Sequence, residues 1–572
     1  MRRCLFWLSA FFALSAIPDA PANPMGGVVT NGAATISESG STLTVNQSTQ
    51  KAIIEWDAFS IGTGEVTSFA QPAGGAALNR VVTANPSEIF GQLNATGSLI
   101  LINPNGILVG AGGQVDTAGF IASTLDVADA EFLAGGDLRF SGGSDKGVTN
   151  LGSIVARDGD LFLLGASVTN GGSLSAPNGT VGLAAGSRIL VTATGDERVF
   201  VEVGSGGKVE HSGEIRAAIA ELKAAGTDPN VIAVNVGGLI EATGVQRSGG
   251  KIFLNGGGGR VQITAPVEAK PAPESNPVSG TVIEIGGGDI DIRDTHVQAF
   301  GPGDADIALD AARDVTITDA TVGPVDATGG SLTATAGRDF KLIGLHGLSL
   351  FGGTSRTGVP VDTVIDVTAG RNVVVSSAST GQAGIGNAGG GGVPVGRPNV
   401  SAGGNISVIY PAPPPHAGGG SGGNIVIIGG GSNGGGGSWS PPVFIGGNLG
   451  GGSLTSTSLG ASRPKVQTES EAVAGSAVMS ANDSGAGRTV SASNPLDREM
   501  SRRTGRASAP DSSPQDRDEN RISNASGGDG APVNSGAKNG SASPGGADAS
   551  QIRRLFDPMG RRQFIETRIG GQ

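Results

Sequence analysis

No feature restricts the fold of this chain as much as the short apolar stretches that recur directly after paired glycines. Each stretch has the alternation of a half-buried strand, and each glycine pair marks the turn before it. Three longer segments share small residues, an arginine, an acid or asparagine and then a strand, and their arginines Arg313, Arg338 and Arg371 lie 25 and 33 residues apart. Repeats of this length are typical of solenoid coils, which bury their inner sides only by stacking. The short stretches are GGLIEA, GGKIFL, GGDIDI, GGSLTA, GGNISV and GGNIVI.

The composition favours the same architecture. The 572 residues include 101 glycines and 30 prolines, and 37% of all residues are hydrophobic although only 4% are aromatic. Glycine destabilises a helix by roughly 1 kcal/mol relative to alanine, so a helix-rich globular fold is disfavoured. Small aliphatic side chains can instead fill a narrow core between stacked strands. We therefore predict an all-β fold, a right-handed parallel β-helix, followed by a disordered Gly/Ser-rich C-terminal tail.

The first 22 residues have the pattern of a secretory signal peptide. Two arginines precede an apolar run, Cys4–Ile17, which is too short to span a bilayer comfortably. The small residues Ala20 and Ala22 fit a cleavage site, so we expect the Sec translocase to export the chain and cleavage to fall between Ala22 and Asn23. Cys4 is the only cysteine, so the mature chain forms no disulfide and can stay unfolded before a second membrane crossing.

Two motifs lie within the segment Ala77–Val127. The upstream motif is Leu78-Asn79-Arg80-Val81, and the downstream motif, NPNGI, is Asn103-Pro104-Asn105-Gly106-Ile107. Together with the signal peptide, they resemble the N-terminal secretion domain, or haemagglutination activity domain, of filamentous haemagglutinin-like exoproteins, although the NPNL motif of some members is not evident. The resemblance implies two-partner secretion through a dedicated outer-membrane transporter. It also implies a secreted or cell-surface location in a Gram-negative-type bacterium.

The NPNGI motif is also the sequence of a type I turn. Pro104 presets φ at the second position, Asn103 can hydrogen-bond within its own turn, and Asn105 tolerates unusual backbone conformations. The motif can therefore direct folding of the first coils or contact the transporter directly, and the sequence leaves both roles open. Both predict a secretion defect on mutation, but only the first predicts that folding of the isolated domain fails.

Sequence texture divides the mature chain into four parts. Residues 23–203 are assigned to the secretion domain, which begins the β-helix, and residues 204–410 to further coils. Residues 411–550 are a Gly/Pro/Ser-rich linker or disordered region, and residues 551–572 form a short basic and apolar tail. One interruption is expected to be helical: Gly213–Gly226 (GEIRAAIAELKAAG) places Ile215, Ile219 and Leu222 on one helical face.

No group of residues has the spacing of a known active site. The mature chain lacks a nucleophile motif or a phosphate loop, and its histidines His211, His296, His346 and His416 are scattered. We predict no catalytic residue, metal or cofactor. An Asp-rich stretch leaves three readings open, namely calcium binding, general acid and base catalysis, or turns on a solvated acidic face. It comprises Asp289, Asp291, Asp294, Asp304, Asp306, Asp310, Asp314 and Asp319.

Three functions follow from these readings. The leading one is a noncatalytic, adhesin-like exoprotein that binds a glycan or protein on a host or cell surface along its extended faces. The second is a β-helical carbohydrate-active enzyme that uses the Asp-rich stretch, and the third is a contact-toxin carrier with a C-terminal payload. The net charge of −12 disfavours nucleic acid as a partner, because phosphates would be repelled.

Overall fold

The computed structural model describes residues 23–411 except 203–204, 246–247, 274–279, 358–360, 362, 379–381 and 388–397, together with four short strands between residues 444 and 478. The expected signal peptide with Ala22, most of the expected linker at 411–550 and the tail at 551–572 lie outside the described residues.

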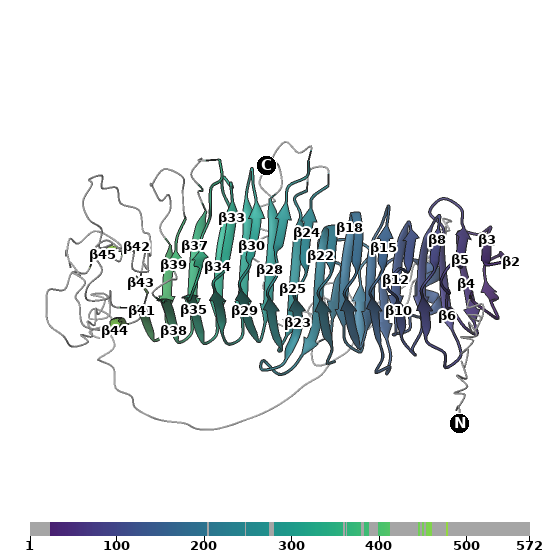
Figure 1. Ribbon diagram of the computed structural model, residues 1–572, viewed down its shortest axis with the longest axis horizontal. Helices are drawn as coiled ribbons and strands as arrows, with labels where there is room; N and C mark the ends of the chain where they lie inside the picture. The colour runs from purple at the N-terminus through teal and green to yellow at the C-terminus, as the bar shows by residue number, and fades with distance from the viewer. Residues whose placement is uncertain are drawn as a thin grey trace, which may run out of the picture. The chain divides into compact units, whose positions relative to one another are not determined.

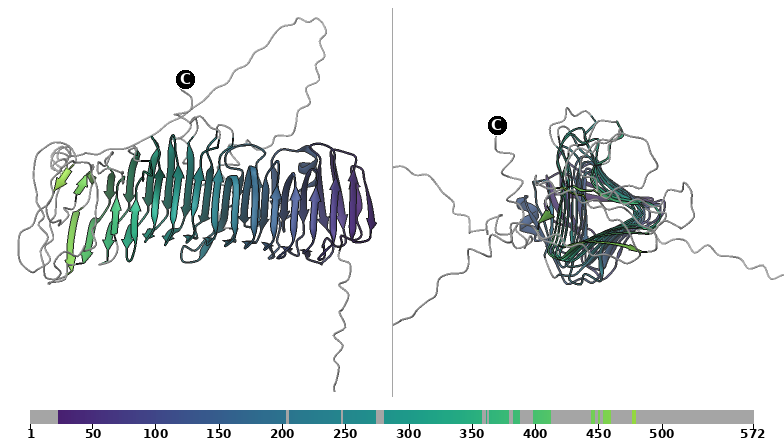
Figure 2. Two further views of the ribbon diagram at one scale, coloured as in Figure 1. Left: turned by 45° about the horizontal axis from the view of Figure 1, so that its top comes forward. Right: turned by 90° about the vertical axis from the view of Figure 1, so that its left-hand side faces the viewer.

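The described chain winds into a solenoid with three faces, which the end-on view in Figure 2 shows around a common core. Each coil passes from face 2 through face 1 to face 3, and neighbouring coils pair in parallel along the axis (Figure 1). This arrangement confirms the predicted parallel β-helix.

The strands of each face are as follows. Face 1 contains β1 (Val28–Asn31), β4 (Lys51–Trp56), β6 (Ala76–Val81), β9 (Ser98–Ile102), β12 (Gly119–Ser123), β16 (Leu161–Gly165), the second halves of β18 (Ser173–Ala185) and β22 (Glu214–Gly226), β25 (Lys251–Gly257), β28 (Thr281–Gly287), β31 (Ala305–Ala311), β34 (Ser331–Ala336), β37 (Val364–Ala369), β40 (Asn399–Ala402) and β43 (Leu449–Gly450). Face 2 contains β2 (Ala34–Ser39), β3 (Thr42–Gln47), β5 (Val66–Ala70), β8 (Gln92–Ala95), β11 (Gln114–Thr117), β15 (Ser153–Ala156), the first halves of β18 and β22, β24 (Leu239–Thr243), β27 (Val267–Lys270), β30 (His296–Phe300), β33 (Thr321–Val325), β36 (Leu348–Phe351) and β39 (Gln382–Ile385). Face 3 contains β7 (Ser87–Ile89), β10 (Ile107–Val109), β14 (Gly147–Asn150), β17 (Ser167–Asn170), β21 (Lys208–His211), β23 (Ile232–Val236), β26 (Arg260–Ile263), β29 (Asp289–Arg293), β32 (Val315–Thr318), β35 (Asp339–Gly344), β38 (Asn372–Ser377), β41 (Asn405–Pro411) and β44 (Ser453–Leu459).

Faces 1 and 2 belong to one sheet of 27 strands, whereas face 3 is a separate sheet of 13 strands. The two faces join because β18 and β22, each 13 residues long, turn the corner between them without a break. At the far end, β43 and β44 pair in parallel with β40 and β41. The stack therefore continues past the expected boundary at residue 410. Beyond these coils, β42 (Phe444–Gly446) and β45 (Ser476–Val478) pair with each other in antiparallel fashion.

The helix expected at residues 213–226 is wrong, because Glu214–Gly226 is strand β22. Its first half pairs with β24 and its second half with β25. Ile215 and Leu222 are both buried in the core, since the corner between the two halves shifts the alternation of inward side chains by one residue. Two inward residues seven positions apart resemble a helical face in the sequence, although Ile219 lies only half buried at the corner.

The paired glycines mark corners of the solenoid. Gly238 precedes β24, Gly250 precedes β25 and Gly288 precedes β29, so the short stretches occupy different faces and not one repeated position. The coils approach closely at these corners: a Cβ on Gly238 would lie 2.2 Å from the carbonyl oxygen of Gly213 in the preceding coil. A larger residue there would force the two backbones apart.

The interior is filled mainly by small aliphatic side chains, with one group of aromatic residues in the first coils and a pair, Phe340 and Phe351, in a later coil. The Trp56 and Phe59 rings meet edge to face, with centroids 5.5 Å apart. The first coil has no parallel neighbour before it, so β1 and β2 pair in antiparallel fashion with β4 and β3 and close this end. Asn23, the expected first mature residue, is itself buried and accepts a hydrogen bond from Thr67 (3.2 Å).

A polar column interrupts this apolar interior in three successive coils. The Asn150 side-chain amide donates to Asn170 (2.8 Å), and the Asn170 amide lies 3.0 Å from Nδ1 of His211, whose Nε2 lies 3.1 Å from the carbonyl oxygen of Leu239. Burial lowers the pKa of His211 despite these hydrogen bonds. The ring is therefore a neutral link in the column, and both of its nitrogens are used in hydrogen bonds within the core.

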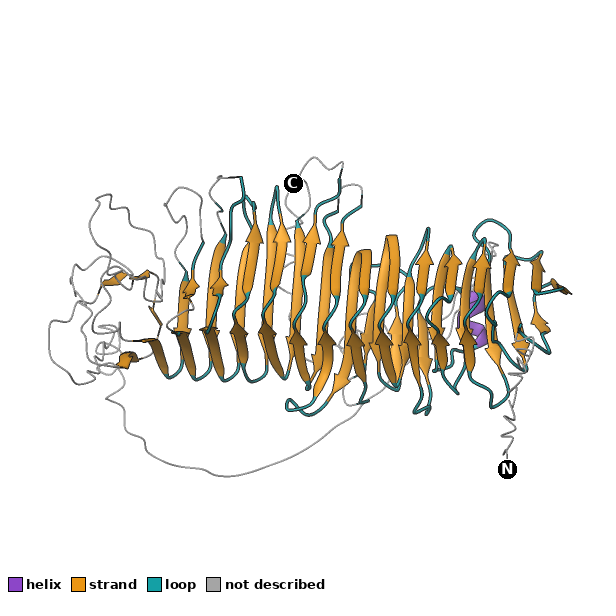
Figure 3. Cartoon of the chain, viewed as in Figure 1, coloured by secondary structure: helices purple, strands orange, loops and turns teal. Residues whose placement is uncertain are grey.

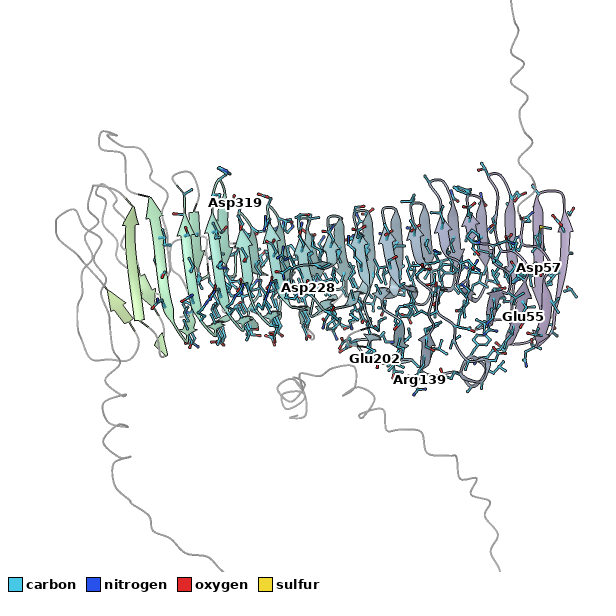
Figure 4. The ribbon with its side chains drawn as sticks, turned by 90° about the horizontal axis from the view of Figure 1, so that it is seen from below. Glu55, Asp57, Arg139, Glu202, Asp228 and Asp319 are labelled. Carbon is cyan, nitrogen blue, oxygen red and sulfur yellow. The ribbon has the colours of Figure 1, made fainter. Side chains whose placement is uncertain are left out.

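A covering layer lies against the outer side of face 1 in the N-terminal half of the solenoid. It consists of α1 (Asp129–Ala134, Figure 3) and the antiparallel strands β13 (Leu138–Ser141), β19 (Arg188–Val191) and β20 (Val199–Val201). In Figure 4, Arg139 of β13 and Glu202, just after β20, mark the side of the solenoid that this layer occupies. The only helix among the described residues is α1, and no described helix has the length and apolar character to cross a membrane.

The covering layer creates a second hydrophobic core. Apolar side chains on the outer side of face 1, among them Ile100, Phe162 and Leu164, pack with the layer's Phe132 and Phe140. Strands such as β9 are consequently buried on both sides. Because both sides are apolar, these strands do not alternate between apolar and polar residues. Their sequences therefore do not show which side chains point towards the solenoid axis.

Candidate functional site: the NPNGI corner

The NPNGI motif forms the corner between β9 on face 1 and β10 on face 3. Asn103 is fully buried there, and its side-chain amide donates to the carbonyl oxygen of Asn85 and to Oγ of Ser87, both at 2.9 Å. Both acceptors belong to the preceding coil, where β7 pairs with β10. The first asparagine of the motif therefore joins two successive coils at their corner.

The rest of the turn is closed by the second asparagine and the glycine. Oδ1 of Asn103 accepts from the backbone N–H of Asn105 (2.9 Å), and the Asn105 amide donates to the carbonyl oxygen of Thr83 (2.8 Å) in the coil before. Gly106 donates to the Asn103 carbonyl oxygen (3.1 Å), which is the hydrogen bond of a four-residue turn. Its φ of +107° lies in a region that side chains disfavour.

Only part of this corner is open to solvent. Pro104 is exposed and Asn105 is half buried, whereas Ile107 lies in the main core. The carbonyl oxygen of Pro104 accepts from Oγ of Ser144 (2.6 Å), at the end of the excursion that carries α1 and β13. The corner is thus fixed from two sides, by the preceding coil and by the root of the covering layer.

The upstream motif at residues 78–81 distributes its side chains over both cores. Leu78 lies in the second core, and Val81 lies in the main core. Asn79 points inward and accepts from Nε1 of Trp56 (3.0 Å). Arg80 points outward and binds Asp126 (3.0 Å) and Asp129 (2.9 Å), which hold the start of α1. No pattern in the sequence indicates these partners, which come from another coil and from the covering layer.

The Asp-rich stretch does not gather into one site. At the corner between faces 1 and 3, Asp289, Asp314 and Asp339 stack in successive coils, and the guanidinium of the next coil binds each one: Arg313 binds Asp289, Arg338 binds Asp314 and Arg371 binds Asp339. Each contact uses two guanidinium nitrogens. The repeated arginines of the sequence are therefore structural rungs of this Asp–Arg ladder. The stretch expected from the sequence omitted Asp339, because that residue lies twenty residues beyond it.

The remaining aspartates of the stretch hold turns and strands. Asp319 has a φ of +47° and accepts from the backbone N–H groups of residues 345, 346 and 347 at distances of 2.7–3.2 Å. Asp306 accepts from Ser331 (2.7 and 2.8 Å), and Asp291 binds Arg293 on its own strand (2.6 Å). Asp294 has a φ of +52°, Asp304 precedes β31 and Asp310 lies within it.

Within the described residues, no group of three or more His, Cys, Asp or Glu side chains is arranged to hold a metal ion. The histidines are used separately. His211 lies in the core, the Nε2 atom of His296 lies 2.9 Å from Glu268, and the backbone of His346 donates to Asp319. His416 lies outside the described residues.

The stabilising role of the Asp–Arg ladder can be tested by measuring how the stability of the folded chain changes at acid pH. Burial by itself raises the pKa of Asp314, but hydrogen bonds from Arg338 and Lys341 and the charge of Lys341 lower it to about 2. The carboxylate has a pKa of about 3.9 in an unfolded chain, so its contribution is complete above about pH 5 and is lost as the pH falls towards 2. We expect Asp314→Asn to lower the free energy of unfolding at pH 7 by about 1–2 kcal/mol.

The deficit of Asp314→Asn should shrink steadily between about pH 4 and pH 2, where the native aspartate also becomes neutral. Urea unfolding monitored by circular dichroism at several pH values measures this difference. Asp145→Asn is the matched control, because its side chain is 86% exposed. A deficit that stays constant down to pH 2 would show that the charge of Asp314 is irrelevant.

Part of the chain matches a known family. Residues 20–266 match the model of the TPS secretion domain, which confirms the resemblance seen in the two motifs, and this part of the chain is built on a parallel β-helix.

The chain is similar to two curated relatives and to solved structures, two of which are described below. A heme/hemopexin-binding protein of Haemophilus influenzae strain Rd is 32% identical over 246 residues, which are 41% of this chain and 27% of the relative. A second heme/hemopexin-binding protein of Haemophilus influenzae is 41% identical over 86 residues, 15% of this chain and 9% of the relative. The chain thus matches about a quarter of the length of the first relative.

The solved structures are secretion domains. That of HMW1 from Haemophilus influenzae has 20% sequence identity and a TM-score of 0.41, and the match covers 66% of this chain and 95% of that domain. That of filamentous hemagglutinin has 12% identity and a TM-score of 0.28, with 53% and 94% covered.

Proposed function

We propose that the chain is a two-partner secretion exoprotein. A signal peptide directs it through the Sec translocase, a dedicated outer-membrane transporter exports it, and it acts outside the cell or on its surface as a noncatalytic, adhesin-like binding protein. The observation that carries this proposal is the NPNGI corner, with its coil-joining asparagines, inside the segment that matches a TPS secretion domain.

For the motif itself, the geometry favours a folding role. The side chains of both asparagines donate hydrogen bonds to the preceding coil. Pro104 is the one residue of the motif that is exposed. In the folded state, a transporter could therefore contact little of the motif besides Pro104. The motif therefore acts by starting the stack of coils as the chain emerges, and stacking outside the cell opposes return through the pore.

A binding role without catalysis is supported by how the Asp-rich stretch is used. Carboxylates that accept two guanidinium nitrogens, or several backbone N–H groups, are held in the ionised form and are poorly placed to act as general acids. The solenoid instead offers long outer surfaces on faces 2 and 3, where a glycan or protein ligand can be contacted by many coils at once. A toxin payload would lie outside the described residues.

The test compares supernatant, cell surface and periplasm for the native chain and for Asn105→Ala, with and without the candidate transporter. We expect transporter-dependent export of the native chain and a loss of at least about tenfold for the variant, which loses a partly buried hydrogen bond to the preceding coil. Pro104→Ala is the control, because it removes an exposed ring and its restriction of φ but leaves the hydrogen bonds of both asparagines in place. Export that needs neither the transporter nor Asn105 would refute two-partner secretion.

A further inference from the structure

A buried ionic cluster lies where the covering layer meets the solenoid. Glu221 and Lys223 project from the outer side of β22, and their side chains are 0% and 6% exposed. At the corresponding positions of earlier coils, face 1 presents apolar residues such as Phe162 and Leu164 to the same layer. The charged pair Glu221 and Lys223 therefore occupies positions that are apolar in the rest of the second core.

The two side chains hold the beginning of β20. The carboxylate of Glu221 accepts from the backbone N–H groups of Arg198 (2.6 Å) and Val199 (3.0 Å). The ammonium of Lys223 donates to the carbonyl oxygen of Val199 (2.5 Å), contacts Glu221 at 2.8 Å and also binds Glu197. It lies 5.0 Å from the centroid of the Phe200 ring, so both the polar and the apolar parts of this strand are engaged.

Two further ion pairs fasten the same segment to other coils. Arg198 binds Asp160, directly before β16, at 3.0 Å. Asp196 binds Lys251, the first residue of β25, at 2.7 Å. Residues 196–200 are therefore tied to three coils, those of β16, β22 and β25. Only the contacts to β22 are fully buried.

The order of these parts along the chain matters. The covering layer is assembled from two excursions, one that follows β12 and one that follows β18, whereas Glu221 and Lys223 arrive only with the next coil. Burial alone would lower the pKa of Lys223, but the carboxylates of Glu221 and Glu197 raise it, so the ammonium stays charged in the closed state. A closed layer with only one of the partners would bury an uncompensated charge, which is strongly unfavourable.

We propose that Glu221 and Lys223 form a latch that locks the covering layer onto face 1 only when the coil containing β22 has been added. Until then the layer covers the apolar outer side of face 1 loosely, and afterwards the layer stays closed over face 1. The latch is a property of the folded chain. Its role in ordering the steps of export rests on the function proposed above.

The test uses hydrogen exchange of the purified full-length chain. We expect Lys223→Met, which keeps an unbranched side chain one atom shorter but removes the charge, to speed amide exchange in β19 and β20 by at least about 100-fold, since one buried charge loses its partner. Amides of β28 and β31, far from the layer, should stay protected. Arg216→Met is the matched control, because Arg216 lies on the same strand but is 53% exposed and faces away from the layer.

A second measurement follows refolding of the native chain by pulse-labelling exchange. Protection of β19 and β20 should rise together with that of β22 and later than that of β12 and β16. The latch is refuted if the exchange of β19 and β20 in Lys223→Met stays within about twofold of the native value, or if these strands gain protection before β22 does. Both measurements are made without a transporter, so a failure of the export proposal leaves them interpretable.

Discussion

Replacing Asn103 with alanine is expected to lower the free energy of unfolding by about 3 kcal/mol and to abolish export. The side chain satisfies the carbonyl oxygen of Asn85, the hydroxyl of Ser87 and the backbone N–H of Asn105, all at 2.9 Å, from a fully buried position. Each buried polar group that loses its partner costs about 1–3 kcal/mol. Urea unfolding of the purified chain and the fraction found in the culture supernatant measure the two effects.

The same pair of measurements separates the two roles that the sequence left open for the motif. If NPNGI acts through folding, stability and export fall together in Asn103→Ala, and exposed Pro104→Ala changes stability by less than about 1 kcal/mol. A variant of Asn103 that is as stable as the native chain but no longer exported would instead establish direct recognition by the transporter, and the folding role would have to be abandoned.

The sequence predicts the repeating coils of the solenoid better than it predicts which side chains contact one another. Arg313, Arg338 and Arg371 do occupy the same corner in successive coils, because each must reach an aspartate of the coil before it. The glycine pairs do mark turns. The helix expected at Gly213–Gly226 fails because a strand that turns a corner places Ile215 and Leu222 on the same side, and this spacing also suits a helix.

Two features of the site could not be read from the sequence, since both depend on register between distant segments. Asn103 meets Asn85 and Ser87 because β10 pairs with β7, and the irregular spacing of the first coils hides that pairing. The covering layer combines excursions that leave two different coils, so β13 and β19 pair across about fifty residues. In the sequence, the apolar residues that make these contacts resemble those of any other strand. No sequence pattern distinguishes the residues on the outer side of face 1 from those on the inner side.

The second core should therefore depend on single large side chains of face 1. Phe162→Ala is expected to lower the free energy of unfolding by about 3–5 kcal/mol, the usual cost of removing a buried phenylalanine ring. Phe162 is 2% exposed and lies in the cluster that joins β16 to the covering layer. The loss should fall on the layer first, because the inward residues Leu161 and Leu163 of the same strand keep the main core intact.

Urea unfolding gives the total loss, and hydrogen exchange resolved by segment shows where it falls. Phe90→Ala is the control, since this ring is 38% exposed at a corner outside the layer and should cost less than about 1 kcal/mol. If Phe162→Ala opened the layer and the solenoid equally, the two cores would form one cooperative unit. The layer would then be an integral part of the β-helix, and a latch on β22 would have no separate element to close.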